Sequence, residues 1–324
     1  MNTPVLFLIF NRSETAARVF RQIRKMRPPA LYIAADGPRP NRIGEAKLCE
    51  QTRRTILSLI DWPCEIKTLF REKNLGCKQA ISSAITWFFE HVEEGIILED
   101  DCLPDLSFFR FCEELLKKYR DNERIMMVSG NCHLNKPPPI SESYYFSHFT
   151  YIWGWATWKR AWEHMDLRLQ NPTILFPDGL SPHIRKWWGN TFEQNRDRGS
   201  SWAIAWQFSC WNRQGLSINP AKNLVSHIDT EGTHMKPYDP AVCKSRDPVE
   251  FPLIHPSCIT PQIHFDLLTE NLMRRTFFKN IQLISIYLIR LFSDRKIPVK
   301  QGLAQLILSL KCEMDHRRAL HKRR

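Results

Sequence analysis

Three consecutive carboxylates, Glu99, Asp100 and Asp101, follow the apolar residues 96–98 in this chain of 324 residues. Adjacent like charges repel one another and disfavour a strand, so we expect the chain to have a use for them. A hard divalent cation, Mg²⁺ or Mn²⁺, would offset the repulsion if one or two carboxylates and the oxygens of a bound diphosphate held it. The alternative is a solvated acidic turn, which is common after a buried strand.

Apolar strands alternate with amphipathic helices in the first third of the chain. We expect strands over residues 5–10, 30–36, 64–70 and 95–101, and helices over residues 14–26, 45–60 and 77–92. This alternation predicts an α/β fold in which crossover helices connect parallel strands. Ligands of such folds bind outside the carboxyl ends of the strands.

Polar residues follow each of these four strands. They are Asn11 and Arg12, Asp36 and Gly37, Arg71 and Asn74, and the three carboxylates. Because parallel strands end at one edge of a sheet, we expect these residues to form a site. If the fourth strand reaches residue 101, Glu99 and Asp101 point to one face and Asp100 to the other.

Several other functions are not supported by the sequence. No GxGxxG fingerprint follows the first strand, and no GxxxxGK[ST] loop is present to bind a triphosphate. The ten cysteines form no CxxC pair, which favours reduced thiols over a zinc site or a disulfide framework. The first residues lack the pattern of a secretory signal, so we do not expect export.

The net charge of +12 is concentrated in the tail, because residues 271–324 contain 13 Lys or Arg and 3 Asp or Glu. The apolar segment 281–292 in this tail is too short and too interrupted by polar residues to span a bilayer. Two interpretations remain open. The tail helices lie on an anionic membrane surface, or they pack on the domain and leave a solvated basic end.

The ordered motifs IFNR, AADGPR, REKNLGCKQAI, GIILEDDCLPDLSFFRF, YIWGWATWKRAW and EGTH resemble bacterial glycosyltransferases of the GT-A fold. More closely, they are similar to nucleotide-diphospho-sugar transferases related to the enzyme that adds the first N-acetylglucosamine to the mannose core of N-glycans. The resemblance covers roughly residues 4–235 and implies a Rossmann-like mixed sheet flanked by helices. We expect a catalytic domain over residues 1–236, a Pro-rich linker over 237–270 and a basic amphipathic helical tail over 271–324.

The resemblance also implies roles for single residues. The last acid of the family's DxD-type motif binds a metal that bridges the nucleotide diphosphate, which gives this role to Asp101 and places Asp100 beside the ribose. His234 in EGTH occupies a position from which some members supply a further metal ligand or phosphate contact, although a lone histidine is often structural. The remaining contacts to a UDP-sugar are expected from Asn11, Arg12 and Asp36 at its base and ribose, and from Arg71, Asn74 and Lys78 at its diphosphate.

The catalytic base is not assigned by the resemblance. The related animal enzyme has an aspartate in a WDDW-like segment, whereas residues 201–206 of this chain read SWAIAW and contain no acid. Asp178, Asp229 and Glu231 are the candidate bases, and a retaining mechanism stays open. Most of the tryptophans are expected in the core. Trp153 or Trp155 is expected at the site, because Gly154 between them indicates a close backbone approach.

The function predicted from these features is metal-dependent transfer of a sugar from a UDP-sugar to a saccharide or lipid-linked acceptor. The expected setting is surface polysaccharide synthesis in the bacterial cytoplasm, with the tail at the inner membrane. A sugar-phosphate nucleotidyltransferase shares the fold but needs a Gly-rich phosphate loop, and IFNRSETAARV after the first strand contains no glycine. A nucleic-acid-binding protein would instead interleave basic and aromatic side chains on its folded domain.

Overall fold

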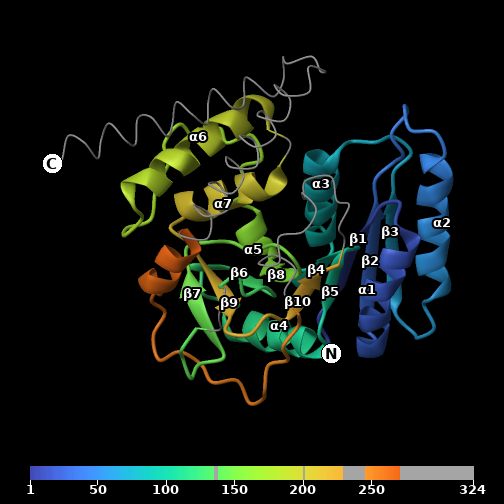
Figure 1. Cartoon of the computed structure of the whole chain (residues 1–324). Helices are drawn as coiled ribbons and strands as arrows, with labels where there is room; N and C mark the ends of the chain where they lie inside the picture. The colour runs from blue at the N-terminus through green and yellow to red at the C-terminus, as the bar shows by residue number, and fades with distance from the viewer. Residues whose placement is uncertain (135–137, 200, 229–244, 271–324) are drawn as a thin grey trace, which may run out of the picture. The chain divides into compact units, whose positions relative to one another are not determined.

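An eight-stranded sheet forms the centre of the molecule (Figure 1). The computed structural model describes residues 1–134, 138–199, 201–228 and 245–270. The strand order is β3-β2-β1-β4-β8-β6-β9-β7, and only β8 and β7 run against the others. The strands are β1 (Val5–Ile9), β2 (Ala30–Ala35), β3 (Glu65–Phe70), β4 (Glu94–Glu99), β6 (Ile125–Ser129), β7 (Tyr144–Ser147), β8 (Trp155–Trp158) and β9 (Leu216–Pro220).

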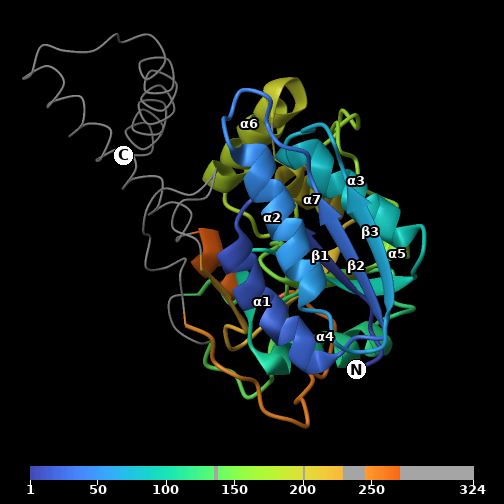
Figure 2. The same cartoon turned by 90° about the vertical axis from the view of Figure 1, so that its right-hand side faces the viewer.

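Helices cover both faces of this sheet because its strands are apolar on both sides. On β1, Val5 and Phe7 pack into one buried cluster, and Leu6 and Leu8 pack into another. The first cluster includes side chains of α1, α2 and α4, and the second includes side chains of α3, α5 and α7, with α6 packed on α7 (Figures 1 and 2). The helices are α1 (Ser13–Met26), α2 (Glu45–Ser58), α3 (Cys77–Phe89), α4 (Leu106–Lys118), α5 (Lys159–Trp162), α6 (Pro182–Arg198) and α7 (Trp202–Asn212).

A second sheet consists of two short antiparallel strands, β5 (Cys102–Pro104) and β10 (Val225–His227). In this pair His227 lies opposite Cys102. Directly after β5, the Asp105 side chain accepts a 2.8 Å hydrogen bond from the Ser107 amide and caps α4. The small sheet therefore brings β10 next to the carboxylates that precede β5.

The expected α/β class, a mixed sheet flanked by helices, is confirmed. One detail of the prediction is wrong, because β4 ends at Glu99 and does not reach residue 101. Asp100 and Asp101 form the turn between β4 and β5. Strand alternation therefore does not separate their side chains, and Arg12 contacts both of them.

Residues Met1–Asp266 form one compact unit. Val249 and Leu253 belong to its core, and the Ser143 amide donates a 2.8 Å hydrogen bond to the Ile254 carbonyl. The proposed boundaries of a catalytic domain, a linker and a tail stay predictions, and the tail over residues 271–324 lies outside the described residues. Within the part of the chain that the structure describes, no helix is both long and apolar enough to cross a membrane.

Candidate functional site

The carboxyl ends of β1 and β4 bring Arg12, Asp100 and Asp101 together. These strands are parallel neighbours in which Leu8 pairs with Glu99, so the residues that follow them lie at the same edge of the sheet. The Arg12 guanidinium forms ion pairs with both aspartates, and its Nη2 lies 3.0 Å from Asp101 Oδ2. Asp100 also accepts a 3.3 Å hydrogen bond from the Phe10 amide. The predicted acidic cluster is therefore a buried charge network rather than a solvated turn.

His227 joins this network from β10, because the pairing of β10 with β5 holds it beside Asp101. The Nε2 atom of His227 lies 3.4 Å from Asp101 Oδ2. The amide of the next residue, Ile228, donates a 2.9 Å hydrogen bond to the Asp101 carbonyl. The His227 side chain is buried, and its Nδ1 has no hydrogen-bond partner within the described chain. Sequence reasoning chose His234 instead, which lies outside the described residues. In the sequence His227 stands in the stretch LVSHID, two residues before Asp229, and nothing there marks it as a ligand.

Burial and neighbouring charges give the three carboxylates different pKa values. Burial, together with the charges of Asp101 and Asp100, raises the pKa of Glu99 to about 8. Burial also raises the pKa of Asp100, to about 6, although Arg12 opposes this change. Burial acts in the same direction on Asp101, but the hydrogen bond from His227 and the charge of Arg12 lower its pKa to about 2. Asp101 is therefore the most completely ionised of the three acids at neutral pH.

Asp101 and His227 fit part of the ligand set of a divalent cation. Two neighbouring ligands about 2.1 Å from one octahedral Mg²⁺ or Mn²⁺ ion lie roughly 3.0 Å apart. Asp101 Oδ2 and His227 Nε2 are 3.4 Å apart, so a small approach of the two side chains would let both bind one ion. Within the described residues, no group of three or more His, Cys, Asp or Glu side chains could hold a metal ion. Any cation bound here would thus need further oxygen ligands, such as those of a diphosphate.

Asp36 and Asn74 connect two loops at the same edge of the sheet. The Asp36 carboxylate accepts hydrogen bonds from the amides of Gly37 at 2.9 Å, Leu75 at 3.0 Å and Gly76 at 3.0 Å. Asn74 Nδ2 donates a 2.7 Å hydrogen bond to the Gly37 carbonyl. These contacts hold the loop before α3 against the end of β2. The predicted binding of Asp36 to the base or ribose remains a proposal, and its visible contacts are with the backbone.

The other predicted nucleotide contacts have partners within the chain. Arg71 Nη2 donates a 2.8 Å hydrogen bond to Ser83 Oγ on α3, and burial lowers the pKa of Arg71. Lys78 Nζ lies 3.3 Å from the Gly199 carbonyl at the end of α6, and burial lowers its pKa as well. Neither side chain joins the network of Arg12 through a contact seen here.

Asn11 is held through Glu45 on α2. Asn11 Nδ2 donates a 3.1 Å hydrogen bond to Glu45 Oε1, and Arg39 forms an ion pair with the same carboxylate. The hydrogen bond from Arg39 is the main reason why the pKa of Glu45 is lowered. Among the candidate bases, Asp178 is exposed in the loop before α6, whereas Asp229 and Glu231 lie outside the described residues.

Trp153 and Trp155 lie in different environments. Trp155 is 1% exposed and its ring centroid lies 5.8 Å from that of Trp202, so it belongs to the core. Trp153 is only partly buried, and its ring centroid lies 5.1 Å from that of His227. Gly154 has φ +66°, and a Cβ atom there would come within 2.8 Å of Val225 on β10. The glycine thus permits the close approach that places Trp153 beside the network.

The fold and this site define an α/β protein with a buried acidic network at the carboxyl edge of its sheet. No protein-family model and no curated protein matches the sequence. Among solved structures the chain is similar to a cytidylyltransferase from Leptospira borgpetersenii, a UDP-glucose pyrophosphorylase complexed with UDP-glucose, and mouse xyloside xylosyltransferase 1.

These similarities are low. The identities are 11%, 9% and 9%, and the TM-scores are 0.32, 0.34 and 0.32. The matches cover 51%, 68% and 64% of this chain, which spans 64%, 90% and 81% of the three matched chains in the same order. Likeness at this level does not assign an activity.

Proposed function

We propose that this chain is a metal-dependent glycosyltransferase that takes a sugar from a UDP-sugar. The observation that carries the proposal is the Asp101 carboxylate, whose Oδ2 lies 3.0 Å from Arg12 Nη2 and 3.4 Å from His227 Nε2. Asp101 lies just after the carboxyl end of β4, and ligands of parallel α/β sheets bind outside the carboxyl ends of the strands. An ionised acid between a guanidinium and an imidazole suits a divalent cation and a diphosphate.

Each residue of the network has a task in this proposal. Asp101 and His227 would hold Mg²⁺ or Mn²⁺, and the bound ion would stabilise the negative charge that develops on the departing nucleoside diphosphate. Because the pKa of Asp101 is about 2, its carboxylate needs no activation to act as a ligand. Arg12 can pair with phosphate oxygens through the same guanidinium that now pairs with Asp100 and Asp101.

The finer parts of the proposal rest on the ordered motifs. They support membership of the nucleotide-diphospho-sugar transferases related to N-acetylglucosaminyltransferases, with a saccharide or lipid-linked acceptor in bacterial surface polysaccharide synthesis. Asp229 or Glu231 is proposed as the base on the acceptor hydroxyl. His234 is proposed as a further ligand of the metal or the phosphate.

Asp101→Asn tests the proposal, because it removes the charge while keeping the size of the side chain. Calorimetry should show that UDP binding to the unchanged protein depends on Mn²⁺, and that the variant loses about tenfold or more of this affinity. Asp61→Asn is the control, since Asp61 pairs only with Arg24 at the surface among the contacts described. Unchanged Mn²⁺-dependent UDP affinity in a folded Asp101→Asn protein would contradict the proposal. Release of pyrophosphate from UTP and a sugar phosphate would show a nucleotidyltransferase instead.

A further inference from the structure

A row of four aromatic rings begins at His227 and continues away from Asp101. Ring centroids are 5.1 Å apart for His227 and Trp153, and 5.0 Å apart for Trp153 and His133. His133 then stacks on Tyr151, with centroids 4.1 Å apart and an interplanar angle of 21°. We call these four residues the aromatic row. None of the functions proposed above uses it beyond His227.

The sheet topology places the aromatic row at the edge that carries the acidic network. Both β4 and β6 pair antiparallel with β8, so β6 runs parallel to β4. The loop after β6, which carries His133, therefore leaves the sheet at the same edge as Asp101. Because β8 runs in the opposite direction, Trp153 lies at this edge just before β8 begins. Three segments that are distant in the sequence thus contribute to one surface.

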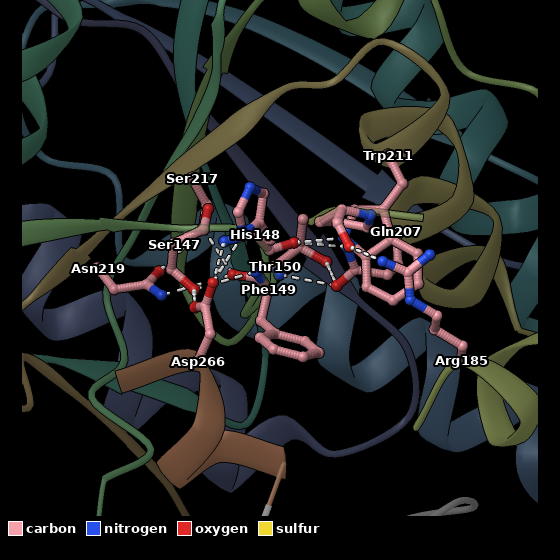
Figure 3. Close-up of polar contacts among 11 residues, drawn as sticks. Ser147, His148, Phe149, Thr150, Arg185, Gln207, Trp211, Ser217, Asn219 and Asp266 are labelled. Carbon is pink, nitrogen blue, oxygen red and sulfur yellow. Dashed lines mark hydrogen bonds and ion pairs between the residues drawn. The ribbon is translucent and has the colours of Figure 1, made fainter. Parts of the chain in front are cut away.

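Buried hydrogen bonds fix the segment that leads into the aromatic row (Figure 3). Asp266 accepts hydrogen bonds from Ser147 Oγ at 2.6 Å and from His148 Nδ1 at 2.8 Å. The side-chain oxygen of Gln207 accepts a 2.8 Å hydrogen bond from the Thr150 amide. Trp211 Nε1 donates a 2.7 Å hydrogen bond to the His148 carbonyl. These hydrogen bonds hold the backbone of residues 147–150 in place, and Tyr151 and Trp153 directly follow this segment in the chain.

The two loops of the aromatic row are also bonded to each other. Ser129 Oγ donates a 2.8 Å hydrogen bond to the Tyr151 carbonyl. The Gly130 amide donates to the Gly154 carbonyl at 2.7 Å, and a Cβ atom at Gly130 would come within 2.5 Å of Val225. The aromatic surface is therefore formed before any ligand arrives, which lowers the entropic cost of binding.

The chemistry of the aromatic row fits a saccharide. Trp153 and His133 are only partly buried, and the negative face of an aromatic ring attracts the C–H groups of a sugar. Two polar atoms nearby are buried without a partner within the described residues, His227 Nδ1 and Asn131 Oδ1. Asn131 is fixed by a 3.0 Å hydrogen bond from its Nδ2 to the Val225 carbonyl. A sugar offers both the apolar face and the hydroxyl groups that such a surface lacks.

We propose that the aromatic row is the acceptor subsite and that it binds a saccharide ring against Trp153 and His133. This inference rests on the proposed function, which places the diphosphate of the donor at Asp101. The transferred sugar is bonded to that diphosphate and stays beside Asp101 and His227. In the aromatic row His227 and Tyr151 are buried, and Trp153 and His133 are the two partly exposed rings. These two rings follow His227 on the side away from Asp101, and we assign them to the acceptor.

Saturation-transfer NMR tests this inference with the methyl glycosides of glucose, galactose, mannose and N-acetylglucosamine as probes. Each probe is measured with the full chain, with and without UDP and Mg²⁺. Trp153→Ala and His133→Ala should each weaken binding of the responding glycoside by about tenfold, the loss expected for one aromatic contact. Trp153→Phe keeps an aromatic face and should restore most of the binding. Trp187→Ala on α6 is the control for loss of a partly buried tryptophan elsewhere.

A parallel titration separates the acceptor from the donor. The two alanine variants should bind UDP and UDP-glucose as the unchanged protein does, and thermal melts should confirm that they are folded. Unchanged glycoside binding in both folded variants would overturn the inference, as would a wild-type chain that binds none of the glycosides. A selective loss of UDP-glucose affinity relative to UDP would assign the row to the donor sugar and would also overturn it. Absence of metal-dependent UDP binding in the wild type would refute the nucleotide site, and the glycoside titration without UDP would still decide the saccharide subsite.

Discussion

At the scale of single residues, Arg12 and a divalent cation would compete for one oxygen atom of Asp101. Asp101 Oδ2 lies 3.0 Å from the Arg12 guanidinium, and a divalent cation would need the same oxygen. The guanidinium and the cation cannot both occupy this position. Arg12 should therefore turn towards the phosphates when the metal and the nucleotide bind together. Such an exchange would make the binding of metal and of nucleotide cooperative, because each ligand would favour the Arg12 conformation that the other ligand needs.

Arg12→Gln should strengthen the binding of Mn²⁺ in the absence of nucleotide by about tenfold, since the competing charge is removed. The same variant should bind UDP more weakly in the presence of Mn²⁺, because a phosphate contact is lost. Calorimetric titration of Mn²⁺ alone and of UDP with Mn²⁺ measures both effects. Arg39→Gln is the matched control, as Arg39 forms its ion pair with Glu45. Weaker or unchanged Mn²⁺ binding would show that Arg12 does not compete with the cation.

At the scale of elements, the site depends on how neighbouring loops are joined. The short pairing of β5 with β10 sets His227 beside Asp101, and the Asp36 carboxylate joins the end of β2 to the loop before α3. The amides of Leu75 and Gly76 would lose this acceptor if Asp36 were replaced. Such a change therefore alters both the stability of the loop and the shape of the sheet edge.

Asp36→Ala should lower the free energy of unfolding by about 1–3 kcal/mol, because the partly buried amides of Gly37 and Gly76 lose their acceptor. If Asp36 belongs to the nucleotide end of the proposed site and not to the sugar end, the variant should also weaken the binding of UDP and of UDP-glucose by the same factor. Urea unfolding and calorimetry give the two quantities. Glu50→Ala, which removes an exposed ion pair with Arg54, should cost little. A loss confined to UDP-glucose would place Asp36 at the sugar or acceptor instead.

At the scale of the whole molecule, the net positive charge is distributed unevenly along the sequence. The compact unit ends at Asp266, whereas 13 of the 46 Lys and Arg residues lie in residues 271–324. Each Lys or Arg near an anionic leaflet contributes about 1 kcal/mol of attraction, which decreases as salt rises. We therefore propose that the tail attaches the enzyme to the inner membrane.

Replacing five basic residues near the end of the chain by glutamine tests this attachment. The unchanged protein should sediment with anionic liposomes at low salt, and the substituted protein should remain in the supernatant while binding UDP as before. Neutral liposomes serve as the control for non-specific adsorption. Equal sedimentation of both proteins would favour the alternative in which the basic end is only solvated. The substituted residues are Arg317, Arg318, Lys322, Arg323 and Arg324.

The amino-acid sequence by itself was enough to predict the local features. The alternation of apolar strands and amphipathic helices predicted the α/β class, because hydrophobic periodicity is a property of neighbouring residues. The position of Glu99, Asp100 and Asp101 after a buried strand predicted an acidic cluster at the edge of the sheet. Arg12 was expected at the same edge, because parallel strands end there. Each of these inferences needs only short stretches of chain and the rules of strand geometry.

The tertiary structure decided which side chains meet. It placed His227 beside Asp101, because β10 pairs with β5, and this pairing has no signal in either segment alone. It also distinguished Trp155, which is buried in the core, from Trp153, which is only partly buried, although both flank Gly154. The physical reason is that contacts between distant segments depend on strand order and packing. Those properties arise from the burial of the whole chain and cannot be read from any single motif.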